Sequence, residues 1–236
     1  MEFTDLQAIK EKQNHGLTMT EAIRNLRRRE IRTPFLLIFT SYLFMFWSGP
    51  HVIVFYAVEI FEKVGVSTTN QYLAAIISAS VRVLGGVVGI FIIRLMPRVR
   101  LAMISMTLLS VSMFTLGAVF YLKQFHQSHL LDILPVCCVA LYLFSYGAGA
   151  GPLMHVYTGE LMPPEYKVLA GLNSSLAVTS IFITTKMFPT MLKFLGPYWT
   201  FWIFGIIAFI SNAFYFFFVP ETKGKSLVEI QEGFQK

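Results

Sequence analysis

The chain has 236 residues, of which 55% are hydrophobic and only 14% are charged, and its formal net charge is +6. Soluble domains average about 25% charged residues, so this composition excludes a protein solvated on all sides and favours a bilayer. The positive charge does not indicate a nucleic-acid partner, because most of the arginines flank apolar runs, as cytoplasmic loop charges do. Cys137 and Cys138 are adjacent inside an apolar stretch, which favours buried small residues over a disulfide.

Residues 1–33 predict a polar cytoplasmic leader that contains one short amphipathic helix. Thr18 and Glu21 have the spacing of a capping box, and apolar residues then recur at helical spacing over 22–26. Such a helix would dock beneath a membrane bundle, and a solvated basic leader is the alternative. The leader has no signal-peptide pattern, so we expect insertion to depend on the first membrane span.

Six apolar segments follow, each close to the roughly 20 residues that cross a hydrocarbon core of about 30 Å. They cover residues 34–58, 72–93, 101–122, 130–154, 168–190 and 198–219. We predict an all-α membrane protein, with a six-transmembrane-helix bundle over 34–219 and a cytoplasmic tail over 220–236. An even number of crossings places both termini on one side. The cations of the opposite side are only Lys63, Lys123, Lys186 and Lys193, so the positive-inside rule predicts cytoplasmic termini.

Two features inside the spans indicate more than membrane insertion. Arg82 lies in the middle of the second span, where an ionisable group is costly and marks a functional site by default. The alternative is that Arg82 snorkels or bonds to a neighbouring carbonyl. Small residues in the second and fourth spans favour close helix packing. The fourth span then reaches Gly151 and Pro152, which predict a bend that frees backbone carbonyls beside a transport cavity.

The exit of the last span contains the most specific pattern in the chain. Pro220 stops the helix, a basic turn follows, and Ser226 stands three residues before Glu229, the spacing of a second capping box. Read as Pro-Glu-Thr-Lys-Gly-Lys-Ser, this exit resembles the signature that closes the last transmembrane helix of sugar porters in the major facilitator superfamily. Residues 55–61 and 159–167 resemble two more stretches of that family, in the same order. Within the family, the chain resembles insect facilitated trehalose transporters.

That family has twelve spans, so the resemblance implies one half of a major facilitator fold, helices seven to twelve, preceded by part of the cytoplasmic linker. Facilitated carbohydrate transport, of trehalose or a hexose-like solute, would follow in the plasma membrane, with no cofactor. An N-terminal half or a partner transporter chain would supply the other wall of a midplane site. A truncated reading frame is one alternative: six more spans encoded upstream would restore an ordinary transporter, and finding none would favour a degenerate copy or an accessory protein.

The resemblance also implies a set of substrate-binding positions in the first and fourth spans. These are Ser48, His51, Tyr56, Gly151, Pro152 and His155. The polar residues of the family are not kept, because Met45 and Phe46 replace two glutamines, His51 replaces an asparagine and His155 a tryptophan. Amides donate and accept hydrogen bonds at once, as sugar hydroxyls require, so their loss predicts weak binding of an ordinary sugar. The histidines could compensate by forming a proton-coupled or amine-selective site, or be partnered structural residues.

A second implied site is a cytoplasmic gate of ion-paired loop residues. Its members would be Arg98, Glu160, Lys167 and Glu221. The alternative is that these are ordinary loop charges that follow the topology. Arg94 stands where the family has an acid, which removes the usual negative charge from that helix end.

Two further classes of protein are alternatives to a transporter. A non-transporting half-bundle, or a degenerate paralogue that associates with a full-length transporter, is the competing hypothesis. An enzyme is disfavoured, because the chain has no His-Glu-x-x-His, no Gly-x-Ser-x-Gly and no aspartate pair at membrane depth. His126 and His129 carry no recognisable metal-ligand pattern, and we expect no metal site.

Overall fold

The computed structural model describes residues 17–65, 71–126 and 128–235, and every regular element in this part of the chain is a helix. Its long helices are α3 (Arg29–Trp47) continued by α4 (Pro50–Phe55), α6 (Gln71–Leu95), α7 (Arg98–Leu122), α8 (His129–Ser145) continued by the π-helix η1 (Tyr146–Ala150) and α9 (Gly151–Leu161), α10 (Lys167–Leu195) and α11 (Pro197–Phe218). The short ones are α2 (Met19–Asn25), α5 (Ala57–Val64), the 3-10 turn η2 (Pro164–Tyr166) and α12 (Leu227–Gln235). Six stretches of the described chain are long and apolar enough to cross a membrane, so the predicted six-span all-α bundle is confirmed.

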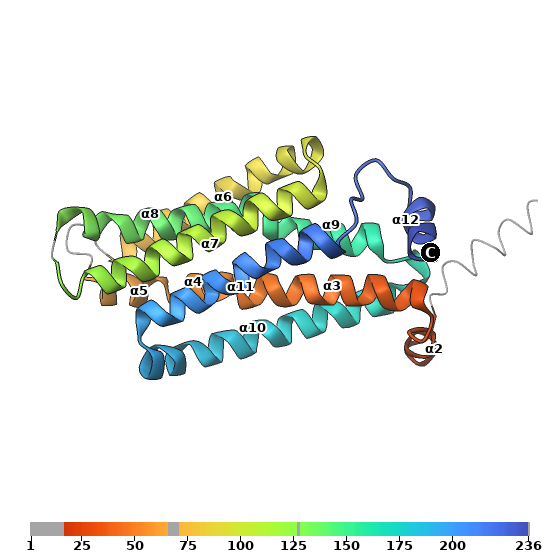
Figure 1. Ribbon diagram of the computed structural model, residues 1–236, viewed down its shortest axis with the longest axis horizontal. Helices are drawn as coiled ribbons and strands as arrows, with labels where there is room; N and C mark the ends of the chain where they lie inside the picture. The colour runs from red at the N-terminus through yellow and green to blue at the C-terminus, as the bar shows by residue number, and fades with distance from the viewer. Residues whose placement is uncertain (1–16, 66–70, 127, 236) are drawn as a thin grey trace, which may run out of the picture.

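The long helices form two groups joined by α11. Helix α8 packs against both α6 and α7, while α10 packs along α3. Helix α11 packs against both α7 and α3. Figure 1 shows α2 and α12 at one end of the bundle, with α5 at the other end. The end that holds α2 and α12 is called the terminal side below. Six crossings require this placement of the two chain ends.

The first span is not the single helix predicted over 34–58. It begins earlier, at Arg29, and is interrupted where Gly49 adopts the left-handed backbone conformation, with φ of 97°. Pro50 then opens α4, because its fixed φ suits a first helical position and it has no N–H to leave unpaired. A side chain on Gly49 would also meet the Phe204 ring, 3.2 Å from the added Cβ. The first span is therefore broken between α3 and α4.

Both predicted capping boxes are present. The Glu21 carboxylate accepts hydrogen bonds from the Thr18 N–H at 3.1 Å and the Thr18 hydroxyl at 2.8 Å. In α12, Glu229 accepts from the Ser226 N–H at 2.7 Å, and the Ser226 hydroxyl accepts from the Glu229 N–H at 3.3 Å. Ala22 is fully buried and α2 contacts α10, so the leader's helix is docked on the bundle rather than solvated.

Candidate functional site

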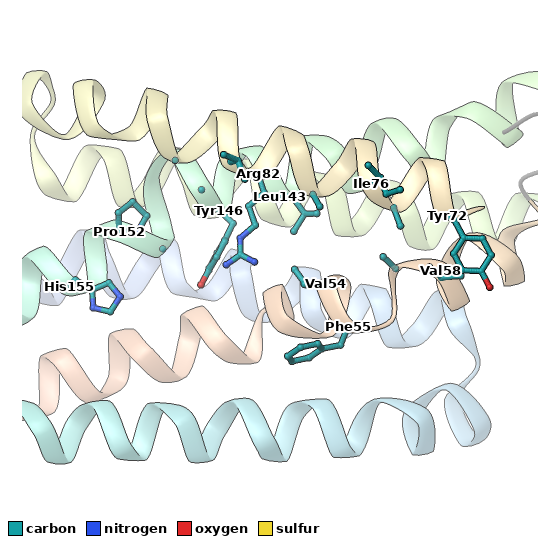
Figure 2. A pocket seen from close by; sticks show the side chains of 17 residues that line it. Val54, Phe55, Val58, Tyr72, Ile76, Arg82, Leu143, Tyr146, Pro152 and His155 are labelled. Atoms are coloured by element: carbon teal, nitrogen blue, oxygen red, sulfur yellow. The ribbon is translucent and has the colours of Figure 1, made fainter. Parts of the chain in front are cut away.

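A cavity of about 800 Å³ opens along one side of the bundle, between α4, α6 and the η1–α9 segment. Figure 2 shows Arg82 reaching into it from α6, Tyr146 beside Arg82, and Pro152 and His155 further along α9. Its volume lies within the range of about 300–1,000 Å³ that is usual for small-molecule sites. The lining is mostly aliphatic and aromatic, and the described residues contribute few polar side chains and no carboxylate to it. We call it the central cavity.

The wall formed by the fourth span owes its shape to the Gly-Pro pair. Pro152 has no N–H and its ring clashes with the carbonyl four residues earlier, so an α-helical register cannot pass through it unchanged. The chain forms the π-helical turn η1 instead, in which the Gly151 N–H donates to the Tyr146 carbonyl, five residues back. The predicted irregularity is therefore present, but it takes the form of a widened turn ahead of Pro152. Such turns often occur at functional sites, and this one presents Tyr146 to the cavity.

Helix α6 approaches η1 so closely that only glycine fits at the crossing. A Cβ on Gly147 would lie 2.5 Å from the Arg82 carbonyl, and a Cβ on Gly85 would lie 2.5 Å from the Phe144 carbonyl. This contact fixes the backbone from which Arg82 projects. The close helix packing predicted from the small residues is confirmed at these positions.

Arg82 is half-buried at the edge of the central cavity. Its guanidinium carbon lies 5.2 Å from the centroid of the Tyr146 ring, a cation–π geometry. Within the described part of the chain, its N–H groups have no hydrogen bond and no ion pair. The alternative in which Arg82 bonds to a neighbouring carbonyl is therefore not what the structure shows.

His51 lies behind the cavity wall rather than in it. Its ring contacts Phe46, Phe55 and Tyr146, with centroid distances of 5.2, 6.3 and 6.2 Å. Its Nδ1 atom is buried, and no described residue bonds to it. His155, by contrast, is exposed and lines the cavity. The two histidines, for which a joint site was one of two alternatives, thus occupy different environments.

Ser48 and Tyr56, the other predicted binding residues of the first span, do not line the cavity. Ser48 is fully buried, its hydroxyl donates to the Met45 carbonyl at 2.6 Å, and its own carbonyl accepts from the Tyr142 hydroxyl at 2.9 Å. Tyr56 turns toward α10, where its hydroxyl donates to the Thr185 carbonyl at 3.4 Å. Both residues therefore stabilise the conformation of the broken first span. The remaining two predicted residues, Gly151 and Pro152, do line the cavity.

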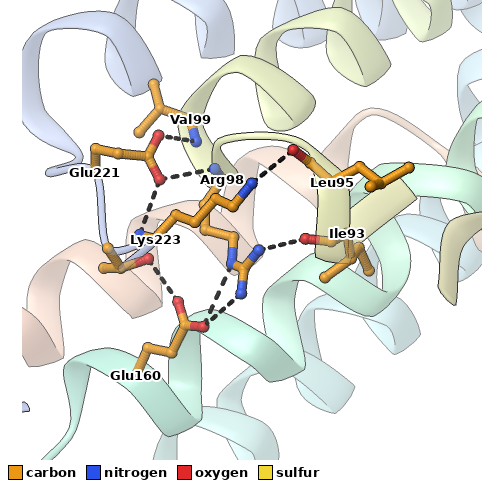
Figure 3. Close-up of polar contacts among 8 residues, drawn as sticks. Ile93, Leu95, Arg98, Val99, Glu160, Glu221 and Lys223 are labelled. Atoms are coloured by element: carbon orange, nitrogen blue, oxygen red, sulfur yellow. Dashed lines mark hydrogen bonds and ion pairs between the residues drawn. The ribbon is translucent and has the colours of Figure 1, made fainter. Parts of the chain in front are cut away.

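A second polar site lies on the terminal side, where the exit after α11 meets α7 and α9 (Figure 3). Arg98 pairs with Glu160, with nitrogen–oxygen distances of 3.1 and 3.3 Å, and also donates to the Ile93 carbonyl. Glu160 accepts a further hydrogen bond from the Thr222 hydroxyl at 2.5 Å. Both partners of the ion pair are largely shielded from solvent, with side-chain exposures of 15% and 28%.

Glu221 completes this site by capping α7. Its carboxylate accepts from the N–H groups of Arg98 at 2.8 Å and Val99 at 3.1 Å, the first two residues of the helix, and from the Lys223 N–H at 3.0 Å. The Lys223 ammonium donates to the Leu95 carbonyl at 2.6 Å, at the end of α6. A carboxylate here satisfies N–H groups that no helix can pair internally and complements the helix dipole.

We call these contacts the terminal-side cluster, comprising Arg98, Glu160, Glu221, Thr222 and Lys223. It includes three of the four predicted gate residues. The fourth, Lys167, is exposed at the start of α10 and forms no ion pair with another residue of the described chain. Thr222 and Lys223 were missed as members, although they stand next to Glu221 in the signature at the span exit.

The opposite end of the bundle holds an ion pair between two long helices that the sequence did not predict. Lys123, at the end of α7, lies 2.5 Å from Asp132 of α8 and donates to the Val64 carbonyl at 2.6 Å. It therefore ties α5, α7 and α8 together. No cluster of three or more His, Cys, Asp or Glu side chains suited to a metal occurs among the described residues.

The profile of the family described as "Sugar (and other) transporter" matches residues 2–234. The chain belongs to this sugar transporter family. Among relatives, it is 31% identical over 95% of its length to the "Facilitated trehalose transporter Tret1" of Drosophila grimshawi, and 34% identical over 80% to that of Bombyx mori. These alignments cover 24% and 38% of the two relatives. The chain thus spans well under half the length of these sugar transporters.

Solved structures place the chain in the major facilitator fold. It superimposes on a crystal structure of a D-xylose–proton symporter with a TM-score of 0.73 at 23% identity, covering 94% of this chain and 49% of that one. For the inward-open xylose transporter XylE from E. coli the TM-score is 0.67, with 98% and 45% covered. The predicted family and the prediction of one half of a major facilitator fold are confirmed, and the chain is an integral membrane protein.

Proposed function

We propose that this chain forms one wall of a pathway by which a small polar solute of the carbohydrate type crosses the plasma membrane. The observation that carries the proposal is the central cavity, which lies beside the middle of α6 and is bordered by a π-helical turn and a Gly-Pro pair. Irregular backbone at membrane depth is tolerated where it is buried in protein or lines a cavity. Insect relatives bear the name of facilitated trehalose transporters, which supports a sugar or a related polar solute.

A second six-helix half would supply the opposite wall, either in the same polypeptide or from a partner chain. The coverage of the solved structures, about half of each, supports this part of the proposal. Helices α6 and α10 also support it, because only 17% and 28% of their most apolar stretches are buried within this chain. Some of this surface would face lipid, and the part beside the cavity would face the second half.

The terminal-side cluster would act as a gate on the cytoplasmic side, with both termini cytoplasmic. It joins the α6–α7 turn, α9 and the exit after α11, and these contacts would form fully in only one of the two positions of the halves. A network that forms fully in only one of two states biases the equilibrium between them. Individual exposed pairs contribute at most about 1 kcal/mol, so the bias would come from the whole cluster.

Uptake into proteoliposomes tests the proposal. The chain is reconstituted alone and together with the N-terminal six spans of the Bombyx mori relative, and influx of radiolabelled trehalose and glucose is measured. We expect saturable uptake only when both halves are present. Saturable uptake by the chain alone would contradict the two-wall proposal. Co-purification of the halves without any uptake would instead favour the competing hypothesis of a half-bundle that associates with a transporter.

A further inference from the structure

Arg82 is a cation at membrane depth that has no counter-ion in the described chain. It is the twelfth of 25 residues in α6, which places it roughly 17 and 20 Å from the two helix ends at about 1.5 Å per residue. The described acidic residues all lie near helix ends or in connecting turns, and none lines the central cavity. Charged groups at this depth are found paired or facing a cavity. Arg82 faces the central cavity and is open to a partner from outside these residues.

The surroundings of Arg82 prepare it to receive that partner. Tyr146 covers the guanidinium at 5.2 Å and leaves the N–H groups without a hydrogen bond within the described chain. The backbone beneath Arg82 is held by the close approach of Gly147, whose Cβ would lie 2.5 Å from the Arg82 carbonyl. Figure 2 shows the guanidinium and the Tyr146 hydroxyl directed into the same space. A fixed fork of donors beside a hydroxyl matches an anion with two acceptor oxygens.

A carboxylate fits these donors best. Guanidinium and carboxylate groups form two parallel hydrogen bonds, and both groups are planar. A second cation would be repelled, which disfavours the amine-selective site considered from the two histidines. A neutral sugar would leave the charge of Arg82 unbalanced in a mostly apolar cavity.

We propose that Arg82 binds the carboxylate of a small organic acid, so that the solute carried is an acid of sugar size. This inference rests on the proposed function and narrows its substrate class. Tyr146 holds the guanidinium in place and offers its hydroxyl to the same carboxylate. The cavity volume of about 800 Å³ accommodates a solute of this size, with His155 exposed further along the wall. A side-chain carboxylate from the second half would have the same chemistry, and the test separates the two sources.

Equilibrium binding to the purified chain in lipid nanodiscs provides the test. Radiolabelled glucuronate and glucose are titrated against the unsubstituted chain and three variants, Arg82→Gln, Arg82→Lys and Arg94→Gln. The last is the matched control, because Arg94 is an exposed arginine at the terminal-side end of the same helix. We expect glucuronate to bind more tightly than glucose. Arg82→Gln should raise the Kd for glucuronate about ten- to a hundredfold, as the loss of a charge-assisted hydrogen-bonded pair predicts. Arg82→Lys should raise it less, and Arg94→Gln should leave it unchanged.

The possible outcomes separate this inference from the proposed function. Glucose binding that is insensitive to Arg82→Gln, without glucuronate binding, would overturn the acid inference and keep the transport proposal. Failure of both solutes to bind this chain would overturn the acid inference, while saturable uptake by the two halves together would still support the transport proposal. Glucuronate binding that disappears when the N-terminal half of the Bombyx mori relative is added would assign the carboxylate to that half, and the inference would be wrong. Circular dichroism of Arg82→Gln establishes that the variant is folded, and the smaller effect of Arg82→Lys keeps the test valid if it is not.

Discussion

Replacing Glu221 by glutamine tests how the exit of the last span is attached to α7. The carboxylate accepts hydrogen bonds from the first two N–H groups of α7 through different oxygens, at 2.8 and 3.1 Å. Glutamine keeps one acceptor oxygen, but its NH₂ group cannot accept from the other N–H, and the negative charge at the helix N-terminus is lost. Since no structural change of the backbone is needed, the effect should be confined to this junction.

The magnitude follows from these two losses. A hydrogen bond to a charged group contributes about 1.5–3 kcal/mol, and Glu221 is partly exposed, so the lower limit applies. The charge–dipole interaction adds about 0.3–1 kcal/mol. We therefore expect a loss of about 2 kcal/mol in the local free energy of opening of the first turn of α7, which corresponds to roughly thirtyfold faster amide exchange.

Hydrogen exchange in nanodiscs, resolved by peptide or by NMR, provides the assay. The amides of Arg98 and Val99 should exchange faster in Glu221→Gln, while those in the middle of α7 should keep their rates. Glu232→Gln serves as the control, because Glu232 is an exposed acid on α12. Unchanged protection at the start of α7, or equal acceleration by the control, would refute the assignment of Glu221 as the cap of this helix.

Three further predictions concern packing, the broken span and pH. Gly85→Ala should lower the free energy of unfolding, measured by steric trapping, by about 1–3 kcal/mol, because its Cβ would lie 2.5 Å from a backbone carbonyl. The control Gly86→Ala, whose Cβ would meet no atom within 4 Å, should change this free energy by less than about 0.5 kcal/mol. Tyr142→Phe removes a 2.9 Å hydrogen bond beside the break of the first span and should cost about 1–2 kcal/mol; an unfolding free energy equal to that of the unsubstituted chain would contradict this. Hydrogen bonds from Ser226 lower the pKa of Glu229 below its ordinary value of 4.5, so the cap of α12 should be stable above that pH and lost as pH falls through the lowered pKa. Exchange of the α12 amides, corrected for intrinsic rates, should show this loss, and Glu229→Gln should abolish the pH dependence.

The parts of the fold that could be predicted depend on residues close together in the chain. The six spans follow from runs of apolar residues, and the capping boxes at Thr18 and Ser226 from spacings of three residues. The break at Gly49 had a visible signal in the pair that it forms with Pro50. It was missed because apolar residues continue on both sides of it, and hydropathy does not register backbone conformation.

The parts of the sites that could not be predicted depend on how helices pack. A π-helical turn needs one residue more than an α-helical turn, and no local pattern states on which side of Pro152 it will form. Tyr146 was missed for that reason, although it directly precedes a run of Gly and Ala that allows the close approach of α6. Lys167 has the right charge for the terminal-side cluster but lies outside it, since sequence position does not determine which face of α10 its side chain leaves from.

The two sites place different demands on the residues that form them. At the terminal-side cluster, Glu221 bonds to backbone N–H groups, and Lys223 and Arg98 to backbone carbonyls, so the contacts depend on the path of the chain and on few partner side chains. At the central cavity, by contrast, the chemistry rests on single side chains, above all Arg82 and its neighbour Tyr146. The sites lie about 20 Å apart along α6 at 1.5 Å per residue, far enough for substitutions in one to leave the other unaffected. Substitutions at Arg82 or Tyr146 should therefore alter the lining of the central cavity while the contacts of the terminal-side cluster stay intact.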